Sequence, residues 1–176
     1  GLMSLRLVPA YGLQVTYLNR PRSGATTLAL FDVESGRTSA LVETQRLTAF
    51  VWSPDGRYLL LTIGVLGEDG SRSYDQLHIY DVVDQRQWLL VEDAFAYGAA
   101  SWSPDSRRVA YTRASPWGVG VFTIDLAGAD ERLITVTEIY PWYPVWSPDG
   151  HWIAFTDYFD NLYVVSAQGG DARALG

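Results

Sequence analysis

The chain of 176 residues contains no cysteine and no lysine, and all thirteen of its basic residues are arginine. Without cysteine, thiol catalysis, disulfide bonds and cysteine-ligated zinc are excluded. Without lysine, the chain supplies neither a Schiff-base lysine nor the lysine of a phosphate-binding loop. No apolar run has the length of a membrane span, and the first residues lack the charged-then-apolar pattern of a signal peptide.

Positive charge is scarce as well. Thirteen basic residues face twenty acidic ones, so the formal net charge is −7. A nucleic-acid binder needs a basic face to neutralise phosphates, and that class is therefore excluded. The apolar fraction of 48% and the charged fraction of 19% predict one folded domain over residues 1–176. Aromatic residues make up 14% of the chain, and that much ring surface must be buried or exposed for a function.

One motif occurs three times. The segments are VWSPDGRYLLLT from Val51, SWSPDSRRVAYT from Ser101 and VWSPDGHWIAFT from Val145. After each motif come an alternating apolar run, a polar loop and two more short apolar runs, which is typical of a β-meander. A fourth copy in the first fifty residues aligns Gly12 with Gly56 but lacks the Trp and the Asp. The repeat length of about 40 to 50 residues indicates four units of roughly four strands, over residues 4–46, 47–95, 96–139 and 140–176.

The WSPDG segment has the chemistry of a tight turn. Proline pre-sets φ, the aspartate carboxylate accepts backbone N–H groups, and glycine supplies a positive φ. We expect this turn to join the innermost strand of each unit to the next strand, with the tryptophan filling the wedge between sheets. Ser106 replaces the glycine in the second motif, so we expect it to adopt the strained conformation at modest cost. The residues given this structural role are Trp52, Asp55, Gly56, Trp102, Asp105, Trp146, Asp149 and Gly150.

These segments and the strands after them resemble the TolB-like β-propeller repeat, a relative of the WD-repeat propellers. The resemblance implies an all-β propeller of about four blades, each of four antiparallel strands. Because propellers of this kind usually have six or more blades, three arrangements stay open: a complete small ring, half of a ring assembled from two chains, or a fragment of a larger propeller. The last unit ends in DARALG, where another WSPDG would follow in a longer array, and this favours a fragment or a pairing chain.

Propellers that this chain resembles serve as binding platforms in the bacterial periplasm, as accessory domains of sensors, and as substrate-gating domains of prolyl-oligopeptidase-like enzymes. We expect a non-catalytic scaffold that binds a protein, peptide or glycan. The alternatives are an accessory or gating propeller of such a hydrolase, or a self-assembling structural subunit whose homodimer completes a ring. The resemblance implies a periplasmic or other extracytoplasmic location in a bacterium, with a cytoplasmic location as the alternative.

The residues that could carry catalysis or hold a metal are few. His78 lies in a predicted strand, His151 follows the third turn, and no Gly-x-Ser-x-Gly elbow exists. We therefore expect no enzyme activity and no cofactor. The acidic segments 67–75 and 157–161 lack the spacing of a calcium-binding loop. We expect solvated loops there rather than metal sites, with calcium left open.

Aromatic loops are the best candidates for binding. The resemblance implies that the connections into the innermost strand, and those between the second and third strands, open on one face of the ring. For Trp142 and Tyr143, packing between blades and exposure on that face are equally expected, whereas for Trp117 and Tyr158 exposure is favoured. The candidate binding residues are Phe95, Tyr97, Arg113, Trp117, Glu138, Tyr140, Trp142, Tyr143, Tyr158 and Phe159.

Overall fold

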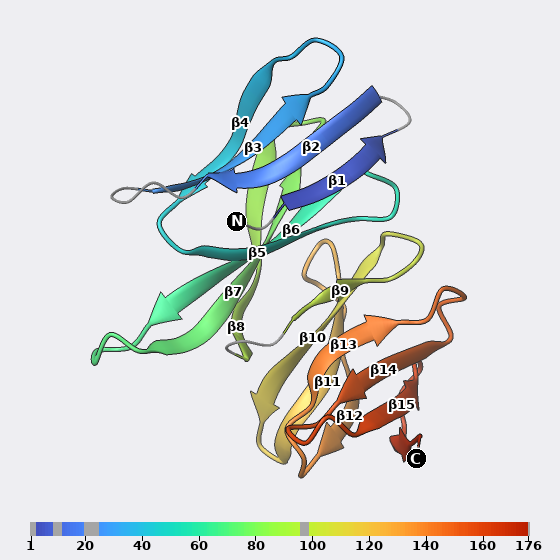
Figure 1. Cartoon of the computed structure of the whole chain (residues 1–176). Helices are drawn as coiled ribbons and strands as arrows, with labels where there is room; N and C mark the ends of the chain where they lie inside the picture. The colour runs from blue at the N-terminus through green and yellow to red at the C-terminus, as the bar shows by residue number, and fades with distance from the viewer. Residues whose placement is uncertain (1–2, 9–11, 20–24, 96–98, 176) are drawn as a thin grey trace.

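A computed structural model describes residues 3–8, 12–19, 25–95 and 99–175 and contains four antiparallel sheets, each built from four consecutive strands (Figure 1). The first sheet consists of β1 (Met3–Val8), β2 (Gly12–Asn19), β3 (Thr26–Asp32) and β4 (Thr38–Thr44). The second consists of β5 (Leu47–Trp52), β6 (Tyr58–Leu66), β7 (Arg72–Asp81) and β8 (Arg86–Phe95). The third consists of β9 (Ser101–Trp102), β10 (Arg108–Ser115), β11 (Gly118–Asp125) and β12 (Glu131–Thr137). The fourth consists of β13 (Trp142–Trp146), β14 (Trp152–Thr156), β15 (Leu162–Ser166) and β16 (Arg173–Ala174). The predicted all-β fold of four four-stranded blades is confirmed.

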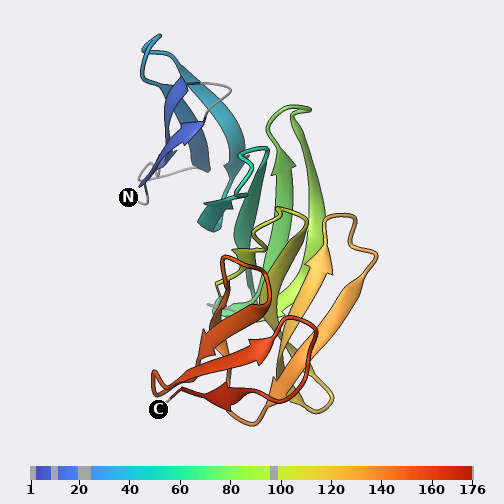
Figure 2. The same ribbon diagram turned by 90° about the vertical axis from the view of Figure 1, so that its right-hand side faces the viewer.

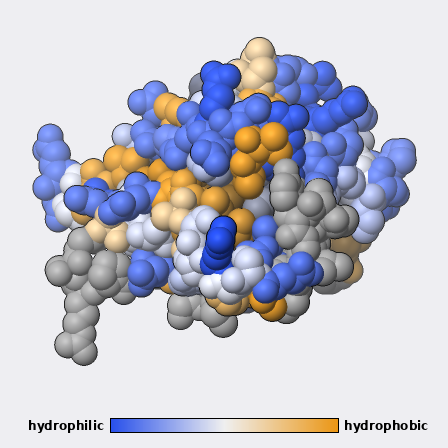
Figure 3. All heavy atoms as spheres, turned by 90° about the horizontal axis from the view of Figure 1, so that it is seen from above, coloured by the Kyte–Doolittle hydropathy of each residue, from blue (hydrophilic) through white to orange (hydrophobic). Residues whose placement is uncertain are grey.

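The four sheets follow one another in a curved row, with the first and the fourth at opposite ends (Figures 1 and 2). Three apolar clusters fill the spaces between neighbouring sheets, and within the described residues none of them joins the first sheet to the fourth. Of the three arrangements expected, the structure therefore shows an open row and not a closed four-sheet ring. Viewed from the end that carries the first sheet, apolar surface is visible in patches between hydrophilic atoms (Figure 3).

Each tryptophan of a WSPD segment packs against the sheet before it. Trp52 donates its indole N–H to Thr16 Oγ1 of the first sheet at 2.9 Å, and Trp102 donates to the carbonyl oxygen of Val51 in the second sheet at 3.1 Å. Trp146 lies against the cluster between the third and fourth sheets, where its buried indole N–H has no partner among the described residues. These rings fill the space between neighbouring sheets as predicted, since one sheet alone cannot bury them.

The turn after each tryptophan is closed by its own serine and aspartate. Ser53 Oγ donates to Asp55 Oδ1 at 2.6 Å and accepts from the amide of Tyr58 at 2.9 Å, while the amide of Arg57 donates to Asp55 Oδ1 at 3.0 Å. The same three contacts recur in the two later turns. These contacts restrict the backbone conformation of the turn, because each carboxylate and hydroxyl binds a backbone group within five residues.

Ser106 takes the place of glycine in the second turn for a structural reason. Its φ of 61° lies in the left-handed region, like the 79° of Gly56 and the 75° of Gly150 in the other turns. The Ser106 hydroxyl accepts from the amide of Asp55 in the preceding turn at 3.0 Å. A strained serine therefore links two neighbouring turns, which a glycine could not do.

The faces that the sheets turn toward their successors differ. In the second sheet, Tyr58 stacks on Trp102 of the third sheet, with ring centroids 6.2 Å apart. Arg108 holds the matching position of the third sheet, two residues beyond Ser106, and Trp152 that of the fourth. Trp152 points away from the third sheet, because its neighbours Ile153 and Phe155 belong to the cluster on that side. It is 44% exposed, so the outer face of the fourth sheet lacks the cover that Tyr58 has.

Two substitutions of Ser106 separate strain from hydrogen bonding. Ser106→Ala keeps the strained φ and loses the contact with Asp55, so we expect it to lower the free energy of unfolding by about 1 kcal/mol. Ser106→Gly loses the same contact but relieves the strain, so its stability should stay within about 0.5 kcal/mol of the wild type. Urea unfolding at neutral pH measures both. Equal destabilisation by the two variants would contradict the role of strain, and an unchanged alanine variant would contradict the role of the hydroxyl.

Candidate functional site

The two ends of each sheet differ in what they present. The innermost strands run into the WSPD turns at one end, so antiparallel pairing places the sheet-to-sheet connections and the hairpins between second and third strands at the other end. We call this second end the loop end. On the third and fourth sheets it consists of the connection between β12 and β13, the hairpin between β10 and β11, and the hairpin between β14 and β15.

Six rings gather at the loop end of the third and fourth sheets. Phe95, at the end of β8, lies 5.9 Å from Tyr140, which precedes β13. Trp142 lies 5.9 Å from Tyr143 and 6.0 Å from Tyr158, and Tyr158 lies 5.5 Å from Phe159. Tyr140, Tyr158 and Phe159 line one pocket together, which connects the two sets of ring pairs. We call these rings the loop-end aromatic cluster: Phe95, Tyr140, Trp142, Tyr143, Tyr158 and Phe159.

Most of the loop-end aromatic cluster is open to solvent. Tyr158 is 69% exposed and Phe159 is 79% exposed, while Tyr140 and Tyr143 are about half exposed at 53% and 48%. Glu138, Ile139 and Asp157 complete the lining of the pocket, whose volume is about 330 Å³. Exposed rings that lie next to one another are uncommon on a protein surface that has no partner, so this cluster is the strongest candidate for a site.

Asp157 builds the loop that carries two of these rings. Its carboxylate is buried, and its Oδ1 accepts from the amides of Phe159 at 2.8 Å and Asn161 at 2.9 Å. Its Oδ2 accepts from Asn161 Nδ2 at 2.8 Å and from the Tyr163 hydroxyl at 3.4 Å. The side-chain hydrogen bond from Asn161, followed by the two amides, lowers the pKa of Asp157. The expectation of solvated acidic loops is therefore wrong for Asp157, whose acceptor positions are used to shape the turn. It is also wrong for Asp75 of the other acidic segment, which is buried.

Backbone strain occurs at two positions of the site. Tyr143 has a φ of 53° although it is neither glycine nor asparagine and precedes Pro144, which restricts it further. Pairing of β13 with β14 shifts register between Trp142 and Val145, so this strain falls in a bulge. Asp160 has a φ of 62° at the tip of the next loop. Strained residues of this kind concentrate at functional sites, where the surrounding structure holds them.

Two of the predicted binding residues, Arg113 and Trp117, do not join the cluster. Arg113 lies over the ring of Phe122 at 4.6 Å and pairs with Glu131 at 2.8 Å and Asp93 at 3.5 Å, between the second and third sheets. Glu131 also accepts from the Tyr111 hydroxyl, and burial raises the pKa of Tyr111 above its usual value. Trp117 is 74% exposed in its own hairpin, with no ring contact to the cluster among the described residues. Tyr97 lies outside the described residues.

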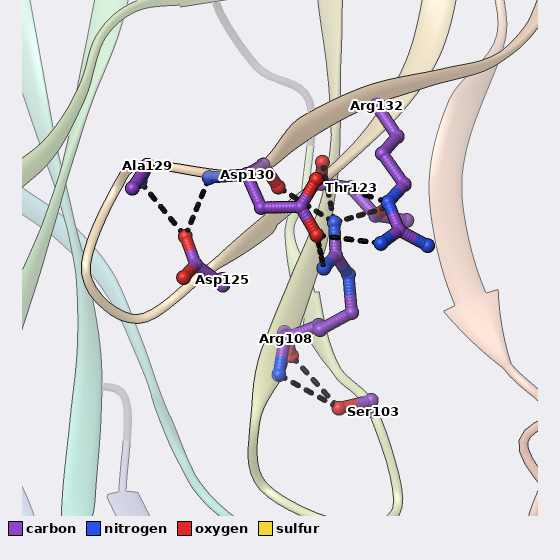
Figure 4. A network of polar contacts seen from close by, with 7 residues as sticks. All are labelled: Ser103, Arg108, Thr123, Asp125, Ala129, Asp130 and Arg132. Atoms are coloured by element: carbon purple, nitrogen blue, oxygen red, sulfur yellow. Dashed lines mark hydrogen bonds and ion pairs between the residues drawn. The ribbon is translucent and has the colours of Figure 1, made fainter.

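At the opposite end, the third sheet carries a charged network (Figure 4). Arg108 donates to Asp130 Oδ2 and to the Asp130 carbonyl oxygen, both at 2.7 Å, and to Thr123 Oγ1 at 3.2 Å. Arg132 pairs with the same carboxylate at 2.7 Å, and Asp125 Oδ1 accepts from the amide of Asp130 at 2.9 Å. The Arg132 and Arg108 side chains lower the pKa of Asp130. Since these charges satisfy one another, the network is a structural feature of the third sheet that sequence reasoning missed.

The two histidines have ordinary surroundings. His78 contacts the side chains of Gln76 at 3.3 Å and Gln87 at 3.2 Å, and burial lowers its pKa. His151 is exposed, with Nδ1 at 3.5 Å from Asp149. Within the described residues, no group of three His, Cys, Asp or Glu side chains is placed to hold a metal ion. None of the described segments forms a helix long and apolar enough to cross a membrane.

Comparison with known proteins gives the fold. No family model matches the sequence. TolB from Acinetobacter baumannii matches with a TM-score of 0.67 and 18% identity over 92% of this chain and 40% of that one. The putative TolB from Agrobacterium tumefaciens matches with a TM-score of 0.69 and 18% identity over 97% and 63%. A chain of the mitotic checkpoint complex matches with a TM-score of 0.67 and 18% identity over 92% and 45%.

The protein described here spans less than two thirds of the length of each of these solved chains. Chains from two enzymes, the tricorn protease and Kuenenia stuttgartiensis hydrazine synthase, match as well, at 14% and 12% identity. At such identities the likeness concerns the fold alone, and one fold serves both enzymes and proteins of other kinds. The expected resemblance is confirmed at this level: the chain has the blade architecture of TolB-like β-propellers.

Asp157 should control the order of the loop that carries Tyr158 and Phe159. Hydrogen bonds lower its pKa in the folded state, so its ordering effect is present above the ordinary aspartate value of 3.8 and is lost as pH falls through the lower folded value. In Asp157→Asn an NH₂ group faces converging donors, and we expect the amides of Phe159 and Asn161 to exchange about tenfold faster. Amide hydrogen exchange by NMR measures this.

The matched control is Asp160→Asn, which removes a charge from the exposed tip of the same loop and should leave both amides protected. Equal exchange in the two variants would contradict the role of Asp157. In the wild type, the two amide shifts should move with a midpoint below pH 3.8.

Proposed function

We propose that the chain is a non-catalytic binding module that recognises a protein or peptide partner through the loop-end aromatic cluster. The observation that carries this proposal is the convergence of rings from three separate segments, with Tyr158 and Phe159 more than two thirds exposed. Tyr and Trp are the residue types most enriched at energetically dominant positions of interfaces. A rigid blade that presents variable loops is a common arrangement for recognition.

Two features support recognition over passive packing. Hydrogen bonds from the loop amides to the Asp157 carboxylate hold the backbone that carries Tyr158 and Phe159. Tyrosine and tryptophan side chains lose little conformational entropy when a partner immobilises them. Stacking rings also suit a glycan, which is the alternative ligand. An alternative function is that of a propeller that gates the substrate of a hydrolase, with catalysis by a further domain. The proposal of a periplasmic location rests on the TolB resemblance alone.

The experiment is selection of a random peptide display library on the wild-type protein. We expect enriched peptides to bind the double variant Tyr158→Ala/Phe159→Ala at least about tenfold more weakly, because truncating rings at interface centres costs more than about 1 kcal/mol each. Trp117→Ala is the matched control, an exposed ring at the same end outside the cluster. Peptides that bind both variants as well as the wild type would contradict the proposal. A glycan array bound only by the wild type would redirect it to a glycan.

A second candidate function is self-assembly, and the outer face of the fourth sheet favours it. Trp152 there holds the position of Tyr58, which in the second sheet is covered by Trp102 of the next. Val145 lies on the same face, because it pairs with Ala154, and it is 55% exposed. Arg173 lies over the Trp152 ring at 5.9 Å and covers it only in part. A second copy that adds its own sheet to this face would bury these groups.

Self-assembly predicts a concentration-dependent dimer of twice the 19.6 kDa chain mass. Trp152→Arg should shift the protein to monomer, because a charge would then lie in an apolar contact. Val83→Arg changes another exposed apolar residue, in the β7–β8 turn, and should leave the mass unchanged. Size-exclusion chromatography with light scattering measures all three proteins. A monomeric wild type at every concentration would reject self-assembly.

A further inference from the structure

The loops around the aromatic cluster carry negative charge only. Segments 115–118, 138–144 and 157–162 include Glu138, Asp157 and Asp160, and none of their residues is arginine, lysine or histidine. Glu138 is exposed and lines the pocket together with Tyr158 and Phe159. Asp157 lies beneath the same pocket, and its hydrogen bonds hold it in the ionised form. With a net charge of −7 on the chain, the surroundings of the pocket favour a positively charged ligand.

Three of the four ring pairs in the cluster stand nearly perpendicular, whereas Phe95 and Tyr140 are tilted by 40°. The planes of Trp142 and Tyr143 meet at 78°, those of Trp142 and Tyr158 at 84°, and those of Tyr158 and Phe159 at 86°. Of these perpendicular pairs, Tyr158 and Phe159 both line the pocket, and the face of each ring carries partial negative charge. Ring faces of this kind attract an ammonium or guanidinium group that comes within about 6 Å of a ring centroid.

Elsewhere in the chain, arginine side chains already lie over rings. Arg57 lies over Tyr58 at 5.1 Å, and Arg113 lies over Phe122 at 4.6 Å. No arginine takes this place on the loop-end aromatic cluster within the described residues. Arg113, the basic residue that the sequence suggested for this site, is tied to Glu131 and Asp93 instead. The ring faces that neighbouring rings leave open on Tyr140, Tyr158 and Phe159 are therefore available for a cation from outside.

We propose that the pocket between Tyr140, Tyr158 and Phe159, with Glu138 at its side, takes the positively charged side chain of an arginine or lysine from the partner polypeptide. This inference rests on the proposed function, because it specifies what the aromatic cluster recognises. Cation–π attraction and the Glu138 carboxylate act on the same group, so both geometry and charge select it. Screening by salt weakens the contribution of the carboxylate at this exposed site.

The test compares two peptides that differ only in charge. One is a peptide of Gly-Arg repeats with an acetylated N-terminus and an amidated C-terminus. The other carries citrulline, a neutral analogue of similar shape, in place of each arginine. Isothermal titration calorimetry gives both affinities, and the NMR signal of the Trp142 indole N–H reports whether binding reaches the cluster. We expect the arginine peptide to bind roughly tenfold more tightly, with the difference shrinking as salt is raised.

Three variants locate the effect. Tyr158→Leu keeps apolar bulk but removes the ring, and Glu138→Gln removes the charge but keeps the shape. Each should reduce binding of the arginine peptide roughly threefold to tenfold while leaving urea unfolding unchanged, since both side chains are exposed. Trp117→Leu is the matched control and should bind like the wild type.

The outcomes separate this inference from the proposed function. Equal affinity for the two peptides, or no binding of the arginine peptide, would overturn the selection of a cation. If peptides from the display library still required Tyr158 and Phe159, the binding function would stand with a different ligand chemistry. If no library peptide required them, both the function and the inference would fall.

Discussion

The contact between each WSPD tryptophan and the sheet before it determines the order of the four sheets. Trp52 and Trp102 each belong to an apolar cluster with the preceding sheet and donate an indole hydrogen bond into it. A sheet in such an array packs only on its neighbours, so this contact is what turns separate meanders into one row. Because the repeated residues act at the turn end, the loops at the other end are free to differ. The aromatic cluster lies in these variable loops.

Sequence reasoning succeeded where the decisive contacts are local. The serine, aspartate and glycine of each turn act within five residues, and the positive φ of Ser106 followed from its alignment with Gly56. It could not place Phe95 against Tyr140, since that contact depends on how two sheets pack. It also could not show that Arg113 pairs with Glu131, 18 residues away on the same sheet, and with Asp93 of the second sheet. Residue type identified the candidate residues, but only the tertiary packing shows which of them join the aromatic cluster.

Variation at one repeated position shows how the interfaces became different. Tyr58 stacks on the next tryptophan, whereas Arg108 binds the Asp130 carboxylate in the same place one sheet later. Trp152 holds that place in the fourth sheet with nothing beyond it in the described structure. An arginine that bonds within its own sheet needs no ring from its neighbour, but a tryptophan gains its burial only from another sheet. The outer face of the fourth sheet therefore presents a ring at the position where Tyr58 makes its contact between sheets.

The aromatic cluster combines two properties that oppose each other. Exposed rings next to one another promote non-specific association, and a folded protein must limit that tendency. Glu138 and Asp160 lie among the rings, so two copies of this face would bring like charges together. The same carboxylates attract a basic partner and lower the cost of bringing it to the rings. Negative charge around an aromatic surface thus acts against self-contact and in favour of a cationic ligand, and one arrangement of residues serves both needs.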